Sequence, residues 1–255
     1  MAQQYSDNIK SVIAWGGEDD IPPVYNSVVL CAIPNQGEDL TVLEKKSISD
    51  YLKTKAVGSA NIIFRSPDYL DLKLDIIFSY NPKLVKLSIY EIESSVKDTV
   101  SSYAKDYLYN FSGSFKESKF LTMLDRVNDS ITGTSLSLHL LKSISIKTYT
   151  TQTHVLDFSN SLDTSLIVHS VFSTGFYTDI TSDICYLVDD RVGNINMVAY
   201  SSTGVLRFVK INIGTVDYVT GKVAFEIFVT TYVGTEFKIN SKPANNNIIS
   251  NRNNI

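Results

Sequence analysis

Few side chains in this sequence could take part in chemistry, and a run of three acids is the most conspicuous group. Glu18-Asp19-Asp20 lies between a pair of glycines and a pair of prolines. Hard cations such as Ca²⁺ bind several carboxylates at once, so the run is a candidate cation site. A solvated acidic loop, or one that binds a basic patch on a neighbouring subunit, explains the run more simply, and we favour that interpretation.

A second pair of acids, Asp189-Asp190, is followed by Asn194. Two carboxylates that flank a glycosidic bond are the machinery of most glycoside hydrolases. Adjacent acids in a turn point in different directions, however, and turns favour Asp, Gly and Asn for conformational reasons alone. We therefore expect these acids to shape a turn and not to catalyse a reaction.

The histidines and cysteines form no recognisable catalytic or metal-binding motif. The three histidines are too widely spaced for a zinc site, and the sequence lacks a nucleophile elbow, a phosphate-binding glycine loop and a dinucleotide fingerprint. Cys31 and Cys185 each lie within an apolar segment, which predicts buried, reduced thiols. We expect no enzymatic activity, no metal ion and no cofactor. The histidines are His139, His154 and His169.

The composition is that of an ordinary globular protein. The chain has 255 residues, of which 44% are hydrophobic and 20% charged, and its formal charge is −4. A dedicated nucleic-acid-binding protein usually concentrates Lys and Arg in a patch, and this chain does not. No apolar run reaches the roughly 18 residues that cross a bilayer, and no signal peptide begins the sequence. We therefore expect neither nucleic acid nor a membrane among its partners.

The first half of the chain alternates between strand and helix periodicity. Thr41 with Glu44, and Ser88 with Glu91, form capping boxes that predict the starts of two helices. Between them, residues 70–78 alternate between apolar and polar, which predicts a strand with one buried face. A third helix is expected from Phe120 to Ile131. The resulting order, β-α-β-β-α-α-β, predicts an α+β fold in which a mixed sheet carries its helices on one face.

Helical periodicity disappears after Tyr149, where Thr, Val, Ser, Tyr, Ile and Phe dominate. Turn signals then recur about every ten residues, which is typical of an antiparallel β-domain. The last residues are polar and rich in Asn. We therefore divide the chain into an N-terminal arm (1–23), an α+β module (24–148), an antiparallel β module (149–240) and a polar C-terminal tail or arm (241–255).

The N-terminal arm ends in a stretch with an unusual composition. Its glycines permit backbone angles closed to other residues, and its prolines fix φ and remove two donors. We expect a stiff, irregular segment with no room for a helix. Trp is enriched among interface anchors, so the stretch is a candidate intersubunit contact or hinge; packing of Trp15 onto its own module is the alternative. The candidate residues are Trp15, Gly16, Gly17, Glu18, Asp19, Pro22 and Pro23.

This stretch closely resembles the arm of baseplate wedge proteins of contractile-tailed bacteriophages, the subunits that build the inner baseplate ring. In that family the arm leads into the first strand of a ring-forming module. The likeness continues over most of the chain. Its further landmarks are the last helix of the α+β module (114–131), two hairpins of the β module (189–195 and 213–223) and a closing strand (247–253).

The resemblance implies a structural virion protein that is assembled in the host cytoplasm and incorporated in the tail baseplate. It implies self-association in a dimer or ring, contact with other wedge proteins and a change of contacts on tail contraction. Such switching needs stiff modules and short hinges, for which 15–23 and 147–149 are candidates. Family members carry further N-terminal domains, so we expect this chain to correspond to a C-terminal portion. A receptor- or glycan-binding tail module is the alternative, and a lytic enzyme the third.

Overall fold

The computed structural model describes residues 7–20, 22–55, 60–84, 88–111, 113–165, 169–201 and 203–250. The chain forms two compact units. One comprises residues 1–69, 101–114 and 249–255, and the other residues 70–100 and 115–248. Helices and strands are both present, and the strands belong to separate mixed and antiparallel sheets, so the predicted α+β class is confirmed.

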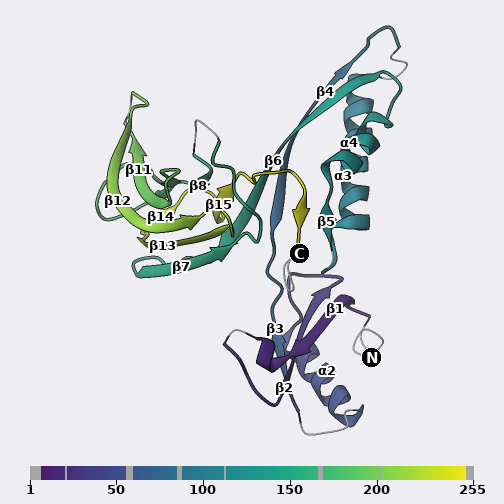
Figure 1. Cartoon of the computed structure of the whole chain (residues 1–255), viewed down its shortest axis with the longest axis vertical. Coiled ribbons are helices and arrows are strands. Elements are labelled where there is room, and N and C mark those ends of the chain that lie inside the picture. The colour runs from purple at the N-terminus through teal and green to yellow at the C-terminus, as the bar shows by residue number, and fades with distance from the viewer. Residues whose placement is uncertain are drawn as a thin grey trace. The chain divides into compact units, whose positions relative to one another are not determined.

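The first unit contains a three-stranded sheet in the order β1-β2-β3 (Figure 1). Strand β1 runs antiparallel to β2, and β3 runs parallel to it. Helix α2 packs against one face through Ile48, which lies in a cluster with Ile9, Ala32 and Leu40. The elements are β1 (Ile9–Gly16), the 3₁₀ turn η1 (Gly17–Asp19), β2 (Ser27–Pro34), α2 (Val42–Lys55) and β3 (Asn61–Arg65).

The structure corrects our expectation of an irregular arm with no room for a helix, because residues 9–16 form a strand of this sheet and residues 17–19 a single 3₁₀ turn. The register of β1 with β2 shifts between Ile9 and Ser11. A bulge of this kind reverses the alternation of side chains, so Ile9 and Val12 pack on the same cluster although they are three residues apart. Ile13 and Trp15 pack on the other face. Because of this bulge, a strict alternation of apolar and polar residues does not predict the strand.

The large antiparallel sheet has the order β4-β6-β15-β8-β10-β11-β12-β13-β7, and β9 and β14 join it beside β10. Figure 1 shows β4 and β6 as a long two-stranded ribbon with α4 beside it. The elements that follow β3 are β4 (Asp71–Tyr80), α3 (Ile89–Tyr107), β5 (Ser114–Phe115), α4 (Glu117–Asp125), β6 (Ile131–Ile144), β7 (Thr151–Asp157), β8 (Val171–Ser173), β9 (Phe176–Tyr177), β10 (Cys185–Asp189), β11 (Asn194–Tyr200), β12 (Leu206–Asp217), β13 (Lys222–Phe228), β14 (Thr231–Tyr232), β15 (Phe237–Ser241) and β16 (Ile248–Ile249).

The predicted element order from residue 24 onward is found apart from the two-residue strand β5, which lies between α3 and α4, but the strands do not share one sheet. Strands β2 and β3 belong to the small sheet, whereas β4 and β6 belong to the large one. The strand β4 shows the predicted alternation of exposed and half-buried side chains over most of its length. Sequence periodicity identifies a strand and its buried face, but it does not name the neighbouring strand.

Both capping boxes form as predicted. Thr41 precedes the first residue of α2, and its hydroxyl accepts a hydrogen bond from the Glu44 N–H at 3.3 Å while the Glu44 carboxylate accepts one from the Thr41 N–H at 2.8 Å. Ser88 and Glu91 make the equivalent bonds at the start of α3. Gly58, a residue type that commonly ends a helix, lies outside the described residues.

The third helix is shorter than expected, because α4 ends at Asp125 and not at Ile131. The Asn128 side chain accepts a hydrogen bond from the Ser130 N–H at 3.0 Å, and the Asn128 carbonyl accepts one from Ile131. This turn competes with helix continuation, since Asn favours such local bonds. Ile131 consequently begins the strand β6.

The expected boundary near residue 148 falls in the turn between β6 and β7. Strand β6 is hydrogen-bonded to β15 from Leu140 to Ile144, so the large sheet continues across that position. Independent folding of 24–148 and 149–240 stays a prediction. The expected polar tail, 241–255, contains the short strand β16, which pairs with β5, and its residues 251–255 lie outside the described part.

Both cysteines are free and fully buried, as predicted. Burial raises the pKa of the Cys31 thiol to about 12, with a smaller contribution from Asp39. Burial also raises the pKa of Cys185. Each thiol is thus a small apolar side chain at neutral pH.

Candidate functional site: the acidic turn and the buried acids

The acidic turn is built around the backbone of Gly17. The Gly17 carbonyl accepts hydrogen bonds from the Asp20 N–H at 3.1 Å and from the Val24 N–H at 2.7 Å. A Cβ atom at Gly17 would lie 2.0 Å from the Val24 carbonyl oxygen, a separation that no side chain tolerates. The glycine is therefore required by a close approach within the chain itself.

One of the three acids turns inward. Asp20 is 9% exposed, and its Oδ2 accepts hydrogen bonds from Arg65 Nε at 2.9 Å and Arg65 Nη2 at 2.7 Å. Arg65 is the last residue of β3, whose pairing with β2 ends there. Charge-assisted bonds of this kind are stronger than neutral ones. They fasten the turn to the far strand of the three-stranded sheet.

The structure separates the predicted site residues into inward and outward groups. Trp15 lies opposite Val29 in the ladder, is half-buried and packs against a cluster of Cys31, Ile33 and Phe111. Gly17 is buried and Gly16 partly so. A role of this stretch in contacts or as a hinge stays a prediction. The outward-facing residues are Glu18, Asp19, Pro22 and Pro23.

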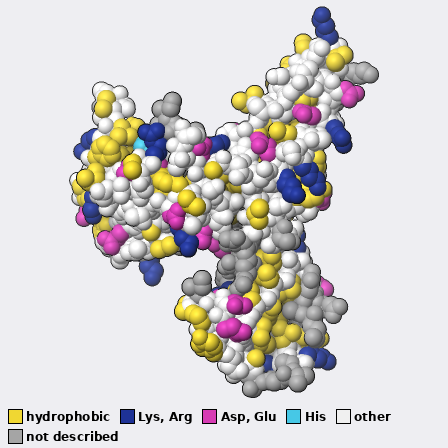
Figure 2. Space-filling model, in the orientation of Figure 1, with side chains coloured by type: hydrophobic (Ala, Val, Ile, Leu, Met, Phe, Trp, Pro, Cys, Tyr) yellow, Lys and Arg dark blue, Asp and Glu magenta, His cyan; other side chains and the backbone are white. Residues whose placement is uncertain are grey.

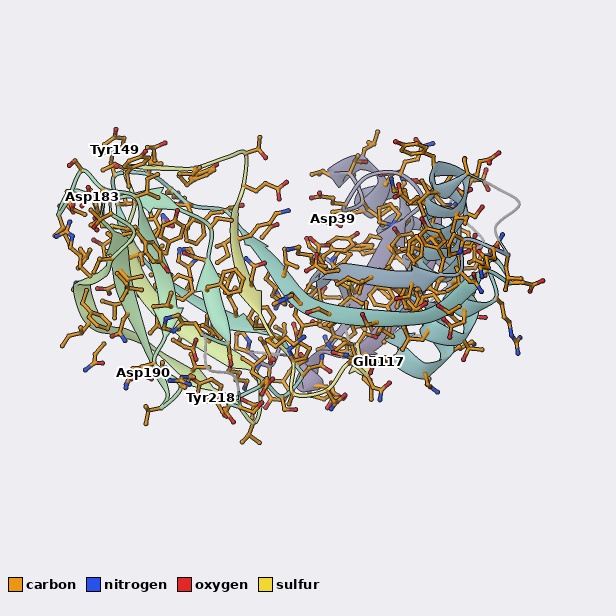
Figure 3. The ribbon with its side chains drawn as sticks, turned by 90° about the horizontal axis from the view of Figure 1, so that it is seen from above. Asp39, Glu117, Tyr149, Asp183, Asp190 and Tyr218 are labelled. Atoms are coloured by element: carbon orange, nitrogen blue, oxygen red, sulfur yellow. The ribbon has the colours of Figure 1, made fainter. Side chains whose placement is uncertain are left out.

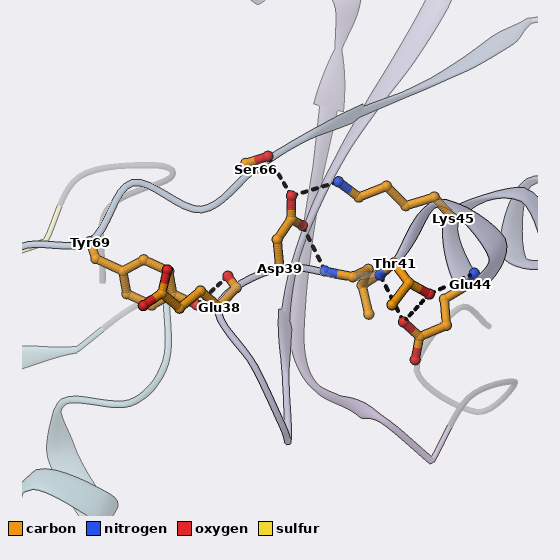
Figure 4. A network of polar contacts seen from close by, with 8 residues as sticks. Glu38, Asp39, Thr41, Glu44, Lys45, Ser66 and Tyr69 are labelled. Atoms are coloured by element: carbon orange, nitrogen blue, oxygen red, sulfur yellow. Dashed lines mark hydrogen bonds and ion pairs between the residues drawn. The ribbon is translucent and has the colours of Figure 1, made fainter. Parts of the chain in front are cut away.

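Sequence reasoning missed a polar network at the start of α2 (Figure 4). The Asp39 carboxylate accepts hydrogen bonds from Lys45 Nζ at 2.6 Å, from the Ser66 hydroxyl and from the Leu40 N–H at 2.7 Å. Burial acts to raise the pKa of Asp39, but these donors outweigh it and hold that pKa below its usual value. The network joins the loop before α2 to the segment after β3. The missed signal was an acid two residues before the N-cap, Thr41.

Asp189 is completely buried and satisfied by protein donors. Its Oδ1 accepts a hydrogen bond from the Val171 N–H at 2.9 Å, and its Oδ2 accepts one from the Tyr218 hydroxyl at 2.6 Å. His169 Nδ1 lies 3.8 Å from Oδ1 and contacts the Asp189 carbonyl. Burial, followed by the bond to Asp189, raises the pKa of Tyr218 well above its usual range. The carboxylate therefore joins three separate segments of the β-rich unit.

Asp190 faces the other way and shapes the β10–β11 hairpin. Its carboxylate accepts hydrogen bonds from the Val192 N–H at 2.8 Å, the Asn194 N–H at 2.9 Å and Asn194 Nδ2 at 2.7 Å. The turn needs positive φ at Arg191 and Gly193. In Figure 3, Asp190 and Tyr218 lie at one end of the β-rich part and Tyr149 and Asp183 at the other. The prediction that the two adjacent acids diverge is confirmed.

The histidines do not form a cluster, and two of them pack against aromatic rings. His139 packs edge-on to Phe172 and His154 lies against Phe225, and burial lowers the pKa of each imidazole. Within the described ranges, no three His, Cys, Asp or Glu side chains gather as a metal ion would require. In the same part of the chain, no helix is both long and apolar enough to cross a membrane.

Two family models match the chain. C-terminal domain I of the baseplate structural protein gp6 matches residues 1–62, which include the acidic turn, and C-terminal domain III of the same protein matches residues 68–143, which include most of the β4–β6 ribbon. Baseplate wedge protein gp6 of Enterobacteria phage T4 is 24% identical over 184 residues, which cover 68% of this chain. The matched residues span only 27% of that relative.

Proposed function

We propose, from the premise that this chain belongs to the gp6 family of baseplate wedge proteins, that it helps to form the inner ring of a tail baseplate. Its place is the virion tail and its role is structural. The proposed activity is mechanical: contact with copies of itself and with other wedge proteins, and a change of those contacts on contraction.

The observation that carries this proposal is the order of the two matched domains. Models of two C-terminal gp6 domains match consecutive parts of the chain, 1–62 and 68–143, which together hold both the acidic turn and the ribbon. Consecutive matches to two domains of one structural protein favour a role in the same assembly. That role is a proposal for this chain, because the match covers only 27% of the relative.

The acidic turn is suited to a contact that must stay rigid. Pro22 and Pro23 fix φ, the Gly17 carbonyl closes the turn, and the Asp20–Arg65 pair anchors it to the sheet. Glu18 and Asp19 are exposed on this fixed base, with the Glu18 carboxylate lying against Gly16, so binding a basic patch would order little additional chain. We propose these two carboxylates as a contact to a neighbouring wedge subunit.

The turn between β6 and β7 is the proposed hinge. Lys147 is held by the Gln152 side chain, whose Oε1 accepts from the Lys147 N–H and whose Nε2 donates to the Lys147 carbonyl, both at 3.2 Å. Tyr149 adopts a φ of 59°, which is uncommon for a residue other than glycine. The Thr150 hydroxyl also donates to the Lys147 carbonyl, and the Tyr149 N–H donates to the Val229 carbonyl at 2.8 Å. A short turn whose bonds are mostly local can absorb a change in dihedral angles without loss of a strand ladder.

Sedimentation velocity of the full chain, from micromolar to millimolar concentration, tests the proposal. We expect association that strengthens with concentration and weakens with salt, and a loss of binding in the double variant Glu18→Lys/Asp19→Lys. The matched control is Glu93→Lys/Asp98→Lys, which reverses two exposed charges on α3. A chain that stays monomeric at every concentration and binds no other wedge protein would contradict the proposal.

One observation favours the alternative, a receptor- or glycan-binding module. Tyr186 and Tyr200 form an edge-to-face pair with ring centroids 5.7 Å apart, and Phe208 is 60% exposed nearby on β12. Figure 2 shows hydrophobic side chains gathered over this part of the β-rich unit. Exposed aromatic patches often mark binding sites. Saturable binding on a glycan array, lost in Tyr200→Ala and Phe208→Ala, would support the alternative.

A further inference from the structure

Strand β4 is a long edge of the large sheet. Over the described ranges it is hydrogen-bonded to β6 alone and stands at the end of the strand order. It has 10 residues, whereas strands usually have about five or six. Natural proteins usually shorten or cover such edges, because the outer N–H and C=O groups are a template for another strand.

The exposed side chains of β4 carry charges of alternating sign. Lys73 and Asp75 have side chains that are 56% and 54% exposed, and Ile77 is 71% exposed. Across the ribbon, Lys73 faces His139 and Asp75 faces Ser137, so β6 supplies no opposite charge at either position. The Lys73 ammonium and the Asp75 carboxylate lie 3.6 Å apart along their own strand.

We infer that two copies of this chain pair antiparallel through β4, with Leu74 opposite its counterpart in the second copy. In this register Lys73 faces Asp75 of the second copy, and Asp75 faces Lys73, so two cross-strand ion pairs form. Leu72 faces Ile76 of the second copy on the other side of the sheet. Directly opposite residues send their side chains to the same face, so Lys73 and Asp75 meet opposite charges and Leu72 and Ile76 meet each other, while Asp71 faces the exposed Ile77 at either end.

Neighbouring registers are disfavoured by the same charges. Centring the pair on Lys73 places two ammonium groups opposite each other and sets Asp71 against Asp75. Centring it on Asp75 places two carboxylates together. Like charges directly opposite in an antiparallel pair are destabilising. Centring the pair on Leu72 also sets opposite charges together, Asp71 against Lys73, but only residues 71–73 of β4 then face each other, whereas the register centred on Leu74 pairs residues 71–77. The charges and the length of β4 together favour the Leu74 register, which closes as a two-fold symmetric dimer.

Charged residues on an edge strand can also prevent pairing, and that reading predicts a different pattern. Charged residues on an edge strand prevent self-pairing when like charges face each other in every accessible register. Here the register centred on Leu74 brings opposite charges together, and the exposed Ile77 adds an apolar side chain beside them. The pattern favours attraction between two copies. The inference rests on the proposed self-association and names the surface that performs it.

Charge reversal on the full chain tests the register. Lys73→Asp and Asp75→Lys each set like charges opposite each other at both symmetric positions, so we expect each single variant to weaken self-association at least about tenfold. The double variant Lys73→Asp/Asp75→Lys exchanges the charges and should restore it. Lys210→Asp, an exposed reversal on β12, is the matched control and should associate as the native chain does.

Mixing the two single variants gives the sharpest result. One then carries two carboxylates at positions 73 and 75 and the other two ammonium groups, so a heterodimer should form although neither variant pairs with itself. If the native chain associates and the single variants do so equally well, β4 pairing is wrong while the proposed function stands. A double variant or mixture that fails to restore association overturns this register. A native chain that is always monomeric contradicts the proposed self-association itself.

Discussion

Asp20 and Asp189 are the acids that the described part of the fold encloses, and each is held by a different kind of donor. Asp20 is bound by a guanidinium that is itself partly exposed, whereas Asp189 is bound by a hydroxyl and a backbone N–H. Removing a donor from a buried carboxylate costs more than the bond contributes, because the carboxylate has lost its water. Substituting a residue that donates a hydrogen bond to either acid should therefore lower the stability of the chain more than most other single substitutions.

Arg65→Ala should lower the free energy of unfolding by about 1–3 kcal/mol, because Asp20 loses both guanidinium donors. Arg65→Lys should fall between the native chain and Arg65→Ala, since an ammonium keeps the charge but not the fork of donors. Urea denaturation followed by circular dichroism measures both. Equal stability of all three proteins would mean that the pair does not anchor the turn.

Tyr218→Phe should reduce stability at neutral pH and flatten the decline of stability in alkali. Because the pKa of Tyr218 is raised in the folded state, its contribution is complete below the ordinary value of 10.0 and is lost as the pH rises through the raised value. Thermal melts of both proteins across the alkaline range measure the difference. Parallel alkaline profiles for the native chain and the variant would contradict the assignment.

Among helices and strands, the sequence correctly predicted the features that depend on residues close together in the chain. The capping boxes predicted the starts of α2 and α3, and alternation predicted the inner, half-buried face of β4. Strand β1 was missed because its bulge breaks the alternation, and α4 was overextended because the Asn128 turn outweighs the apolar spacing. In each failure a single backbone irregularity overrode a pattern that depends on regular geometry.

Thr41→Ala should destabilise the chain by about 1 kcal/mol, because the hydroxyl caps α2. The same box should make stability sensitive to acid. Hydrogen bonds from the Thr41 hydroxyl and N–H, with one from Asn8, lower the pKa of Glu44, so its contribution is present above the ordinary carboxyl value and is lost as the pH falls through the lowered one. Glu44→Gln should remove that dependence in urea titrations at acidic pH. An unchanged acid profile would place the sensitivity elsewhere.

For the whole molecule, the sequence predicted the class and the order of elements but not the partners of the strands. Strand β6 pairs with β15, which lies almost a hundred residues later, and both are simply apolar strands as far as their own sequences reveal. The sequence identified the candidate site residues, but it did not predict which of their side chains face inward. The inward Asp20 and the exposed Glu18 and Asp19 are consecutive in sequence, and the partner of Asp20, Arg65, lies on a strand much later in the chain.

We retain the proposal that the β-rich part folds alone, and a fragment of residues 149–245 tests it. Removing β6 exposes one edge of β15, but its other edge stays paired with β8. The fragment should be soluble and rich in strand, with a lower melting temperature than the full chain, because one ladder is lost. Circular dichroism and amide-proton exchange measure this. A fragment without protected amides would mean that the sheet folds only as a whole.

The two enclosed thiols have a practical consequence. Cys31 and Cys185 are fully buried and their pKa values are raised, so neither offers a thiolate to an alkylating reagent while the chain stays folded. A new cysteine placed on the surface would thus be the one site that a maleimide dye labels, with no native residue replaced elsewhere. Fluorescence energy transfer between dyes on two copies would then report, in solution and in real time, how far apart neighbouring subunits stand before and after a change in their contacts.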